Sequence, residues 1–401
     1  MAQESPKTLS TRAGKWREQQ TGPERFSSFY PAPLPPDPPL NYDTELHEAQ
    51  DKANRALGRL EGVSLLLPDP TSFLHTYIRK EAVLSSQIEG TQSSLSDLLL
   101  FEIKEAPGVP LSDVVPLSDV KEVSNYVAAM YHGLDRLRNG FPLSLRLFKE
   151  IHAILMKETR GSEKEPGEFR RSQNWIGGTR PGNARYVPPP ADEVMQSMGS
   201  LEKFLHDDPV PTPALVKAGL AHAQFETVHP FLDGNGRLGR LLITFILCAE
   251  GVLTQPLLYL SLFFKQNRDT YYEVLQRIRT AGDWEGWLKF YFTGVAEVSN
   301  QASDTAKKLL GMFQEHRGRI ETLGPAAASA LRVHELMKKR VLLSLPTACA
   351  ELGLSFPAVS KAFANLEKLG LVREFTGRQR NRIFSYDPYL SVMTEGIDRS
   401  G

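Results

Sequence analysis

The chain has few cysteines, no excess of either charge and no long apolar run. Only Cys248 and Cys349 occur in its 401 residues, far apart in sequence, so neither a disulfide framework nor a cysteine-based zinc site is expected. Lysine plus arginine number 47, as do aspartate plus glutamate. No global field therefore draws the molecule to nucleic acid or to a membrane surface, and any such contact must be local. Because no run of about 18 apolar residues is present, we expect no membrane-spanning helix and no membrane partner.

The N-terminal region has the composition of neither a signal peptide nor a folded core. Met1–Gln20 is polar with scattered basic residues and lacks the apolar segment of a secretory signal, so a cytoplasmic protein is expected. The proline density of Tyr30–Leu40 excludes helix and central strand. Residues 1–45 are therefore predicted to be a tail. Its proline-rich part is either an extended strap on the protein surface or a disordered linker.

The segment His229–Arg240 concentrates residues that bind phosphate. It reads His-Pro-Phe-Leu-Asp-Gly-Asn-Gly-Arg-Leu-Gly-Arg. The small residues at 234–236 leave backbone N–H groups unobstructed, and the apolar run 241–247 indicates that a helix has just begun. A helix start favours an anion because its first N–H groups lack partners. Arg237 and Arg240 stand three apart and can grip two phosphate groups from one helix face.

Two further residues of the segment suit phosphoryl or nucleotidyl transfer. Asp233 lies at the edge of the loop, where one carboxylate together with phosphate oxygens commonly holds Mg²⁺. His229 is the only side chain of the segment whose ordinary pKa suits a general base near neutral pH. Such transfers need mostly positioning and charge stabilisation, so the segment predicts a polyphosphate site with a metal and a base.

These twelve residues resemble the active-site motif of the Fic (filamentation induced by cAMP) family at every fixed position. The likeness extends to Ser85–Gly90 and to the region near Phe169–Pro190, and it covers roughly residues 45–300. Fic proteins mostly transfer AMP from ATP to a hydroxyl of a target protein and release pyrophosphate. The resemblance implies a mainly α fold with a helical Fic-type core and a β-hairpin flap.

The resemblance also implies a role for each residue of the motif. His229 would deprotonate a Ser, Thr or Tyr hydroxyl of the target, and Asp233 would hold Mg²⁺. The amides of 234–236 would bind the α- and β-phosphates of ATP, Arg237 the β-phosphate and Arg240 the γ-phosphate. The nucleotide-binding residues implied in this way are Glu89, Gly234, Asn235, Gly236, Arg237, Gly239, Arg240 and Asn267.

The hexapeptide Ser85–Gly90 resembles the inhibitory motif of many Fic proteins, with Ser85 four positions before Glu89. The resemblance implies that Glu89 pairs with Arg240, so that the guanidinium cannot also hold the γ-phosphate. ATP would then bind with its α-phosphate turned away from the attacking hydroxyl. The family offers a second role for this glutamate, the positioning of a water that removes AMP, and the sequence does not choose between the two.

Two extended pieces around a Gly/Pro/Asn turn predict a hairpin over residues 167–190. In Fic proteins a hairpin flap borders the active site and aligns the target as an added strand. Trp175 and Tyr186 are expected to pack the hairpin onto the core. His222 is expected to be a structural histidine. Asn267 lies either beside the adenine, as the resemblance implies, or at the N-cap of the following helix.

The C-terminal part resembles a winged helix-turn-helix domain. It shows the pattern of three helices at 327–338, 347–352 and 355–369, followed by a two-stranded hairpin. The hairpin tip carries basic residues, and the third helix carries two residues that could face a DNA groove. Winged helices also serve as protein-docking modules, and a few tip arginines give only a modest phosphate footprint, so DNA contact and protein contact both stay open. These residues are Arg378, Arg380 and Arg382 at the tip, and Lys361 and Asn365 on the helix.

Together these patterns predict a protein adenylyltransferase. Two alternatives stay open, an ATP-sensing DNA-binding regulator and a Fic-type transferase that uses another nucleotide donor or removes AMP. His229 favours a transferase, since sensing needs no base. The expected partners are ATP and a hydroxyl-bearing protein, with DNA and a second copy of the chain as open alternatives. The expected segments are a tail (1–45), a helical region with the inhibitory motif (46–115), the catalytic domain (116–300), a helical linker (301–325) and the winged helix (326–401).

Overall fold

The computed structural model describes residues 10–66, 70–103, 116–377 and 382–395. The chain is mainly α, as predicted, with two small antiparallel sheets in these ranges. Within them, no helix has both the length and the apolar character needed to cross a membrane.

The chain forms two compact units, each built from two stretches of sequence. The first unit comprises residues 1–57 and 125–297, and the second comprises 58–124 and 298–401. Three long helices contribute residues to both units. They are α1 (Thr44–Leu66), α4 (Leu117–Arg138) and α11 (Trp284–Glu321). α11 is one continuous helix, and its second half contains most of the expected linker 301–325.

The expectation of a tail over residues 1–45 is wrong for residues 10–31. They form a sheet in the order β1-β2-β3, from Ser10–Thr11, Gly14–Thr21 and Glu24–Pro31. The Phe29 ring is fully buried and lies 5.1 Å from the Trp16 ring. The sequence of these residues alternates as in a strand, and its apolar residues pack in the first unit. The neighbouring prolines outweighed this pattern in the prediction.

The proline-rich stretch that follows has the contacts of a strap rather than of a disordered linker. Leu34 is buried, and the Ala32 carbonyl accepts a hydrogen bond of 2.7 Å from the Gln224 amide. Arg12 donates to the Pro39 carbonyl at 3.2 Å. The first unit therefore includes its own N-terminal segment as a packed part.

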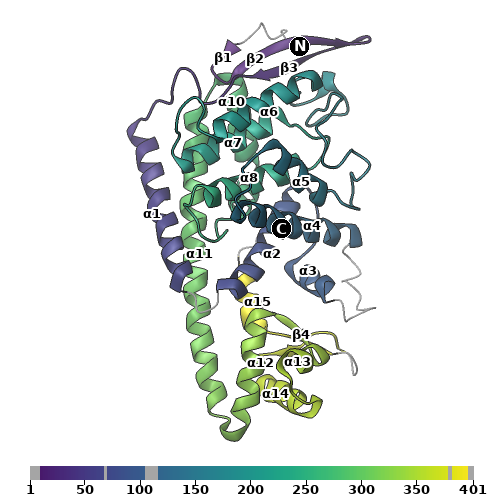
Figure 1. Ribbon diagram of the computed structural model, residues 1–401, viewed down its shortest axis with the longest axis vertical. Helices are drawn as coiled ribbons and strands as arrows, with labels where there is room; N and C mark the ends of the chain where they lie inside the picture. Colours follow the sequence, from purple (N-terminus) through teal and green to yellow (C-terminus); the bar gives the residue numbers. More distant parts are fainter. Residues whose placement is uncertain (1–9, 67–69, 104–115, 378–381, 396–401) are drawn as a thin grey trace. The chain divides into compact units, whose positions relative to one another are not determined.

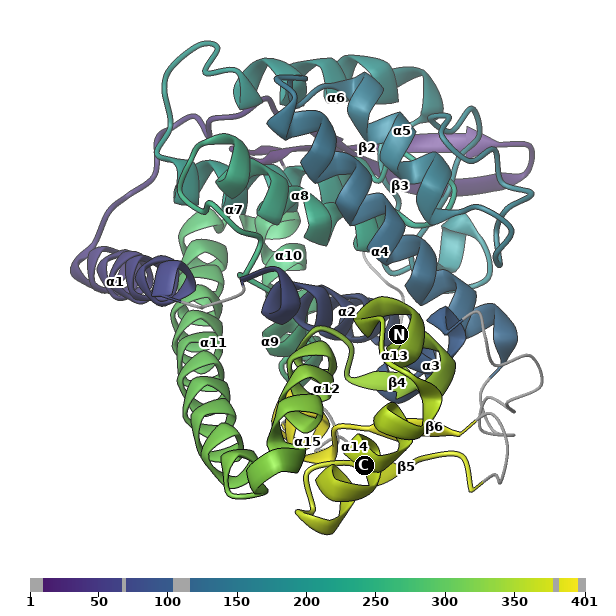
Figure 2. The same cartoon turned by 60° about the horizontal axis from the view of Figure 1, so that its bottom comes forward.

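Helices α7 and α8 form the centre of the first unit and meet side by side in both views (Figures 1 and 2). Every residue of α7 from Leu215 onward is buried, because other helices and the strap cover it. The remaining helices pack around this pair. The helices of the first unit are α5 (Leu145–Leu155), α6 (Ala191–Leu205), α7 (Ala214–Val228), α8 (Asn235–Ala249), α9 (Ser261–Gln266) and α10 (Arg268–Ala281).

The second unit carries the helices around the predicted inhibitory motif and the C-terminal elements. α2 (Pro70–Ile88) ends just before Gly90, which has φ +97°. α3 (Leu95–Glu102) begins with a capping box in which Ser94 and Asp97 bond each other's backbone N–H.

The C-terminal elements follow the predicted order, with one strand and one helix that the sequence pattern did not indicate. The added strand β4 makes a three-stranded sheet in the order β4-β6-β5, whose strands are labelled in Figure 2. Arg382 lies over the Phe384 ring at 5.3 Å, whereas Arg378 and Arg380 are outside the described residues. The winged-helix assignment stays a prediction. The elements are α12 (Ala327–Lys339), β4 (Leu342–Ser344), α13 (Leu345–Leu352), α14 (Phe356–Lys368), β5 (Arg373–Glu374), β6 (Ile383–Ser385) and α15 (Asp387–Thr394).

Candidate active site

His229 ends α7 in a left-handed conformation, with φ 49° and ψ 60°. A residue other than glycine rarely adopts this conformation without support from its surroundings. Here the His229 N–H bonds the Phe225 carbonyl at 2.9 Å, and its carbonyl accepts a bond of 2.9 Å from Arg170 Nε. Its side chain is 19% exposed, with Nδ1 3.9 Å from a Glu226 carboxylate oxygen. The turn thus brings the predicted base to the surface of the helix pair.

Arg170 gathers the backbone around His229. Besides the His229 carbonyl, its guanidinium donates to the carbonyls of Pro189 at 2.5 Å, Ser172 at 3.2 Å and Val228 at 3.4 Å. The residue is 2% exposed, and burial lowers the pKa of its guanidinium to about 10. Since this cation faces the carbonyl end of α7, it also complements the helix dipole.

Two asparagines fix Phe231, two residues after His229 in the turn. Asn235 Oδ1 accepts the Phe231 N–H at 2.9 Å, and its amide group donates to the Phe231 carbonyl at 2.8 Å. Asn174 donates to the same carbonyl at 2.9 Å. The Asn235 side chain, predicted to bind nucleotide, is therefore used to brace the loop, and its backbone N–H remains the group that could meet a phosphate.

His152 supports the same turn from α5. Its ring stacks on Phe231 with centroids 3.7 Å apart. The Gly167 N–H donates to His152 Nδ1 at 2.8 Å, so the ring proton lies on Nε2, which donates to the Asp233 carbonyl at 2.9 Å. Burial lowers the pKa of His152 to about 4. The neutral ring therefore acts as a fixed spacer between two loops.

Gly234 is the N-cap of α8, with φ 75° and no side-chain cap. A Cβ at this position would lie 2.8 Å from the sulfur of Met156, so glycine is required both for the conformation and for the close approach. The first turn of a helix leaves its N–H groups without partners inside the helix. A helix start of this kind favours an anion, and phosphate binding by the backbone amides of 234–236 stays a prediction.

Asp233 lies beside this helix start and is ionised at neutral pH. Burial favours the protonated acid, but hydrogen bonds from Lys164 and from the Gly234 N–H outweigh burial and lower the pKa of the carboxyl below its usual value. Oδ2 is 3.0 Å from Lys164 Nζ, and Oδ1 is 3.9 Å from the Arg237 guanidinium. The side chain is 33% exposed, and a hard, accessible carboxylate of this kind suits Mg²⁺.

The two arginines of the motif lie three residues apart on α8 and are both buried. Arg237 contacts the Met156 sulfur at 3.4 Å. Gly239, between the two arginines in sequence, has a packing role, because a Cβ there would collide with the Glu226 carboxylate. Contact of Gly236, Gly239 and Arg240 with nucleotide stays a prediction.

The predicted hairpin over residues 167–190 is present in a short form, as two antiparallel pieces without regular strands. Only a single bridge forms, between Ile176 and Tyr186, and a 3₁₀ turn at Pro181–Asn183 joins the two pieces. The glycines and prolines of this stretch prevent a longer ladder. Tyr186 packs on the core as expected and donates to the Thr227 carbonyl at 2.6 Å, whereas Trp175 is 39% exposed.

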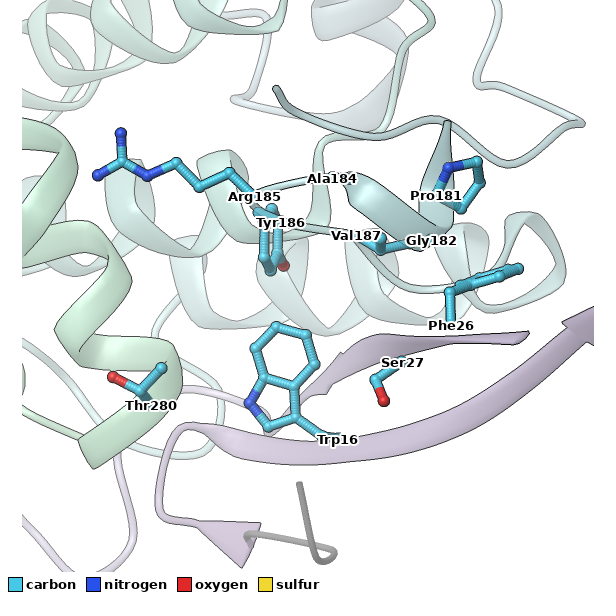
Figure 3. Close-up of a pocket in the computed structure, with 10 residues that line it drawn as sticks. All are labelled: Trp16, Phe26, Ser27, Pro181, Gly182, Ala184, Arg185, Tyr186, Val187 and Thr280. Atoms are coloured by element: carbon cyan, nitrogen blue, oxygen red, sulfur yellow. The ribbon is translucent and has the colours of Figure 1, made fainter. Parts of the chain in front are cut away.

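The segment 176–187 that carries this bridge, called the flap below, rests on the N-terminal hairpin β2–β3. The Phe29 N–H bonds the Val187 carbonyl at 3.0 Å, and the Glu24 carboxylate accepts the Gly182 N–H at 2.9 Å. A cavity of about 320 Å³ lies between them. Figure 3 shows Trp16 from the hairpin and Tyr186 from the flap on its walls, with ring centroids 6.0 Å apart. Residues 24–29, in the segment that the sequence predicts to be a tail, therefore support the flap.

Two residues with open roles are placed by the structure. His222 is structural, as expected: it is fully buried and lies 2.8 Å from the Gly239 carbonyl and 2.9 Å from the Tyr271 hydroxyl. Asn267 occupies the N-cap position of α10, but its amide donates to the Phe263 carbonyl at 3.0 Å instead of capping. Contact between Asn267 and adenine stays a prediction.

Ser85 and Glu89 lie in the second unit, at the end of α2 and just after it. The Glu89 N–H bonds the Ser86 carbonyl at 3.0 Å, in a turn that follows the last residue of the helix. The predicted pair of Glu89 with Arg240 joins residues of the two units and stays a prediction.

Comparison with known proteins identifies the family. The model described as "Fic/DOC family N-terminal" matches residues 47–135, and the model described as "Fic/DOC family" matches residues 142–247. Residues 47–135 and 142–247 therefore carry the two regions that define the Fic/DOC family. A crystal structure of a Fic family protein from Desulfovibrio desulfuricans G20 has the same fold, with a TM-score of 0.55 and 19% identity over 87% of this chain and 97% of that one.

Curated relatives in the Fic family match the catalytic region. "Protein adenylyltransferase Fic" of Drosophila erecta is 34% identical over 149 residues, which is 37% of this chain and 27% of the relative. The protein of the same name from Aedes aegypti is 33% identical over 154 residues, 38% of this chain and 28% of the relative. The chain thus spans little more than a quarter of the length of these relatives.

The structure adds three residues that the sequence did not single out in this Fic site. They are His152, Lys164 and Arg170, and each acts on the motif from at least 59 positions away in sequence. Arg170 stands in an Arg-Arg pair, and nothing in the pair tells the buried member from the exposed one. Only the tertiary contacts identify them.

Proposed function

We propose that the protein is an adenylyltransferase that moves AMP from ATP to a hydroxyl of a target protein. The observation that carries the proposal is the convergence of an uncapped helix start, an ionised Asp233 and the His229 side chain within one short turn. The similarity to proteins named adenylyltransferases supports the same reaction. A protein that only senses ATP needs the phosphate site but no base.

In the proposed reaction, His229 takes the proton of the target hydroxyl. The hydroxyl oxygen forms a bond to the α-phosphorus of ATP, the bond from that phosphorus to the bridging oxygen breaks, and pyrophosphate leaves. The Glu226 carboxylate, 3.9 Å from His229 Nδ1, would stabilise the imidazolium that results. The amides at the start of α8, with Arg237 and Arg240, would hold the phosphates and stabilise the charge that develops on them.

Asp233 would hold Mg²⁺ together with phosphate oxygens of the substrate. It fits this role because it is ionised, partly exposed and adjacent to the helix start. The metal would neutralise negative charge on the phosphates. Residues of the flap around Ile176–Val187 would align the hydroxyl-bearing segment of the target.

We further propose that Glu89 holds the activity low by pairing with Arg240. A charge-assisted bond of this kind contributes about 1.5–3 kcal/mol, which lowers the competent population by about one to two orders of magnitude. The motif Ser85–Gly90 and the buried position of Arg240 on α8 support this. The alternative role of Glu89, removal of AMP, would instead make the Glu89→Gly protein unable to release a label already attached.

One experiment tests the reaction class. Parent, His229→Ala and Glu89→Gly proteins are incubated with Mg²⁺ and ATP labelled at the α-phosphate. We expect a covalent label that survives denaturation, increases at least tenfold in the Glu89 variant and is absent from the His229 variant. In a parallel incubation with ATP labelled at the γ-phosphate, a covalent label would mean kinase chemistry. An α-phosphate label that does not increase in the Glu89 variant would remove the inhibitory role.

The C-terminal elements are proposed as a winged helix that contacts DNA. The three helices with an antiparallel sheet support this, together with the exposed Lys361 on α14. Full-length protein is titrated against a fluorescent random duplex at several salt concentrations. We expect affinity that falls with salt and falls further in Lys361→Gln. No binding at low salt would leave protein docking as the role of this region.

A further inference from the structure

A lysine from a neighbouring loop forms an ion pair with Asp233, the carboxylate that is proposed to bind the metal. Lys164 Nζ lies 3.0 Å from Asp233 Oδ2, while Oδ1 accepts the Gly234 N–H at 2.7 Å. Both oxygens of the carboxylate are therefore in use. The lysine side chain is 43% exposed, so only its charged end is held, and its flexible stem can carry it into solvent.

The loop 157–167 is folded so that it presents this lysine. Gly161 has φ +87°, and a Cβ there would lie 2.8 Å from Asp233 Oδ2, so the backbone of the loop closes directly over the carboxylate. The Lys164 N–H bonds the Gly161 carbonyl at 2.9 Å, and the loop ends where the Gly167 N–H bonds His152. These contacts place the loop without help from the lysine side chain.

We propose that Lys164 is a tethered cation that competes with the divalent metal for Asp233. The inference rests on the proposed function, because it takes Asp233 as the metal ligand. Two cations cannot share one carboxylate oxygen at about 3 Å without strong repulsion. Metal binding therefore requires the Lys164 ammonium to leave. The free energy of the Lys164–Asp233 ion pair is then lost, and the binding free energy of the metal is reduced by this amount.

The second cation near Asp233 cannot leave in the same way. Arg237 lies 3.9 Å from Oδ1 and its side chain is 3% exposed. It belongs to α8 and contacts Met156 in the interior. Lys164 is thus the exchangeable partner, and its loss affects the metal without dismantling the phosphate site.

The expected effect is modest because both partners are partly exposed. Pairs of this kind contribute at most about 1 kcal/mol. Removing the lysine should therefore lower the Kd of the metal three- to fivefold, which corresponds to about 0.6–1 kcal/mol.

The experiment measures free Mn²⁺ by electron paramagnetic resonance. Mn²⁺ is titrated into full-length protein saturated with an ATP analogue that has a methylene group between the α- and β-phosphates, so that no AMP is transferred. The variant is Lys164→Gln. The matched control is Lys157→Gln, which removes the same charge from an exposed position of the same loop. Among the described residues, Lys157 makes no ion pair with a carboxylate.

We expect a three- to fivefold lower Mn²⁺ Kd in Lys164→Gln and a change below 1.5-fold in Lys157→Gln. Equal changes in both would mean general electrostatics and would overturn the proposal, as would a higher Kd in Lys164→Gln. Asp233→Asn should abolish the difference between lysine and glutamine at 164, and a difference that persists would also overturn it. The α-phosphate label experiment is independent, so transfer of AMP can hold while the lysine proposal fails.

Discussion

Replacement of Arg170 by methionine tests whether one buried guanidinium holds the base-bearing turn. Arg170 donates to the carbonyls of His229, Pro189, Ser172 and Val228. Methionine keeps most of the volume and removes every donor. Each carbonyl left buried without a partner lowers the free energy of unfolding by about 1–3 kcal/mol. Removal of the buried charge partly offsets this loss, because a buried charge is itself destabilising. We expect a net destabilisation of about 3–5 kcal/mol.

The matched control is Arg171→Met, the neighbouring residue, which is exposed. Thermal unfolding is followed by tryptophan fluorescence. This signal reports the first unit alone, because all four tryptophans of the chain lie within it, at positions 16, 175, 284 and 287. For a unit of this size, about 1 kcal/mol shifts the Tm by about 2–4 °C, so Arg170→Met should melt about 6–20 °C below the control.

A second measurement separates positioning of the base from loss of fold. At a temperature where both variants are folded, transfer of the α-phosphate label should fall at least tenfold in Arg170→Met, because the His229 carbonyl has lost its anchor. Binding of ATP should change less than threefold, since the amides of α8 are held by other contacts. Arg170→Lys should be intermediate, because one ammonium cannot reproduce a planar fork of donors. A Tm within 2 °C of the Arg171→Met control would refute the reasoning.

Three further predictions concern the same turn and the helices behind it. Gly234→Ala forces a positive φ on a residue with a side chain and drives a Cβ against Met156. It should lower the free energy of unfolding by about 1–3 kcal/mol and weaken ATP binding, measured by calorimetry. Parent-like values would contradict the tight fit. Asn235→Ala removes both bonds to Phe231 and should lower the free energy of unfolding by about 1–3 kcal/mol, measured by urea unfolding against the parent. Burial lowers the pKa of His222 from 6.5 to about 4, so the unfolded state binds more protons in this interval, and stability should be full above pH 6.5 and fall as the pH drops toward 4, by up to about 3 kcal/mol. His222→Gln should lessen this fall, and an unchanged pH dependence of its urea midpoint would exclude His222 as the cause.

The motif could be predicted from sequence because its chemistry lies in twelve consecutive residues. A glycine before an apolar run indicates a helix start, and i,i+3 spacing puts Arg237 and Arg240 on one helix. Local geometry settles such relations.

The supporting contacts could not be predicted because they depend on tertiary packing. Whether an arginine such as Arg170 is solvated or buried against four carbonyls depends on the loop that closes over it. His152 likewise carries no local sign that it will stack on Phe231. The error over residues 10–31 has another cause, since adjacent prolines dominated the pattern and the partner that buries Phe29 lies more than 150 residues away, at Tyr186.

The turn separates the support of its backbone from the chemistry of its side chains. Arg170 and Asn235 bond carbonyls and one N–H of the turn, whereas His229 and Asp233 are the residues proposed to act on a ligand. Lys164 is the exception, because it contacts a functional side chain and not the backbone. It also differs from the braces in exposure, at 43% against 2% for both Arg170 and Asn235. Buried groups of this site therefore fix its shape, and the exposed lysine is the part that can move when charge enters.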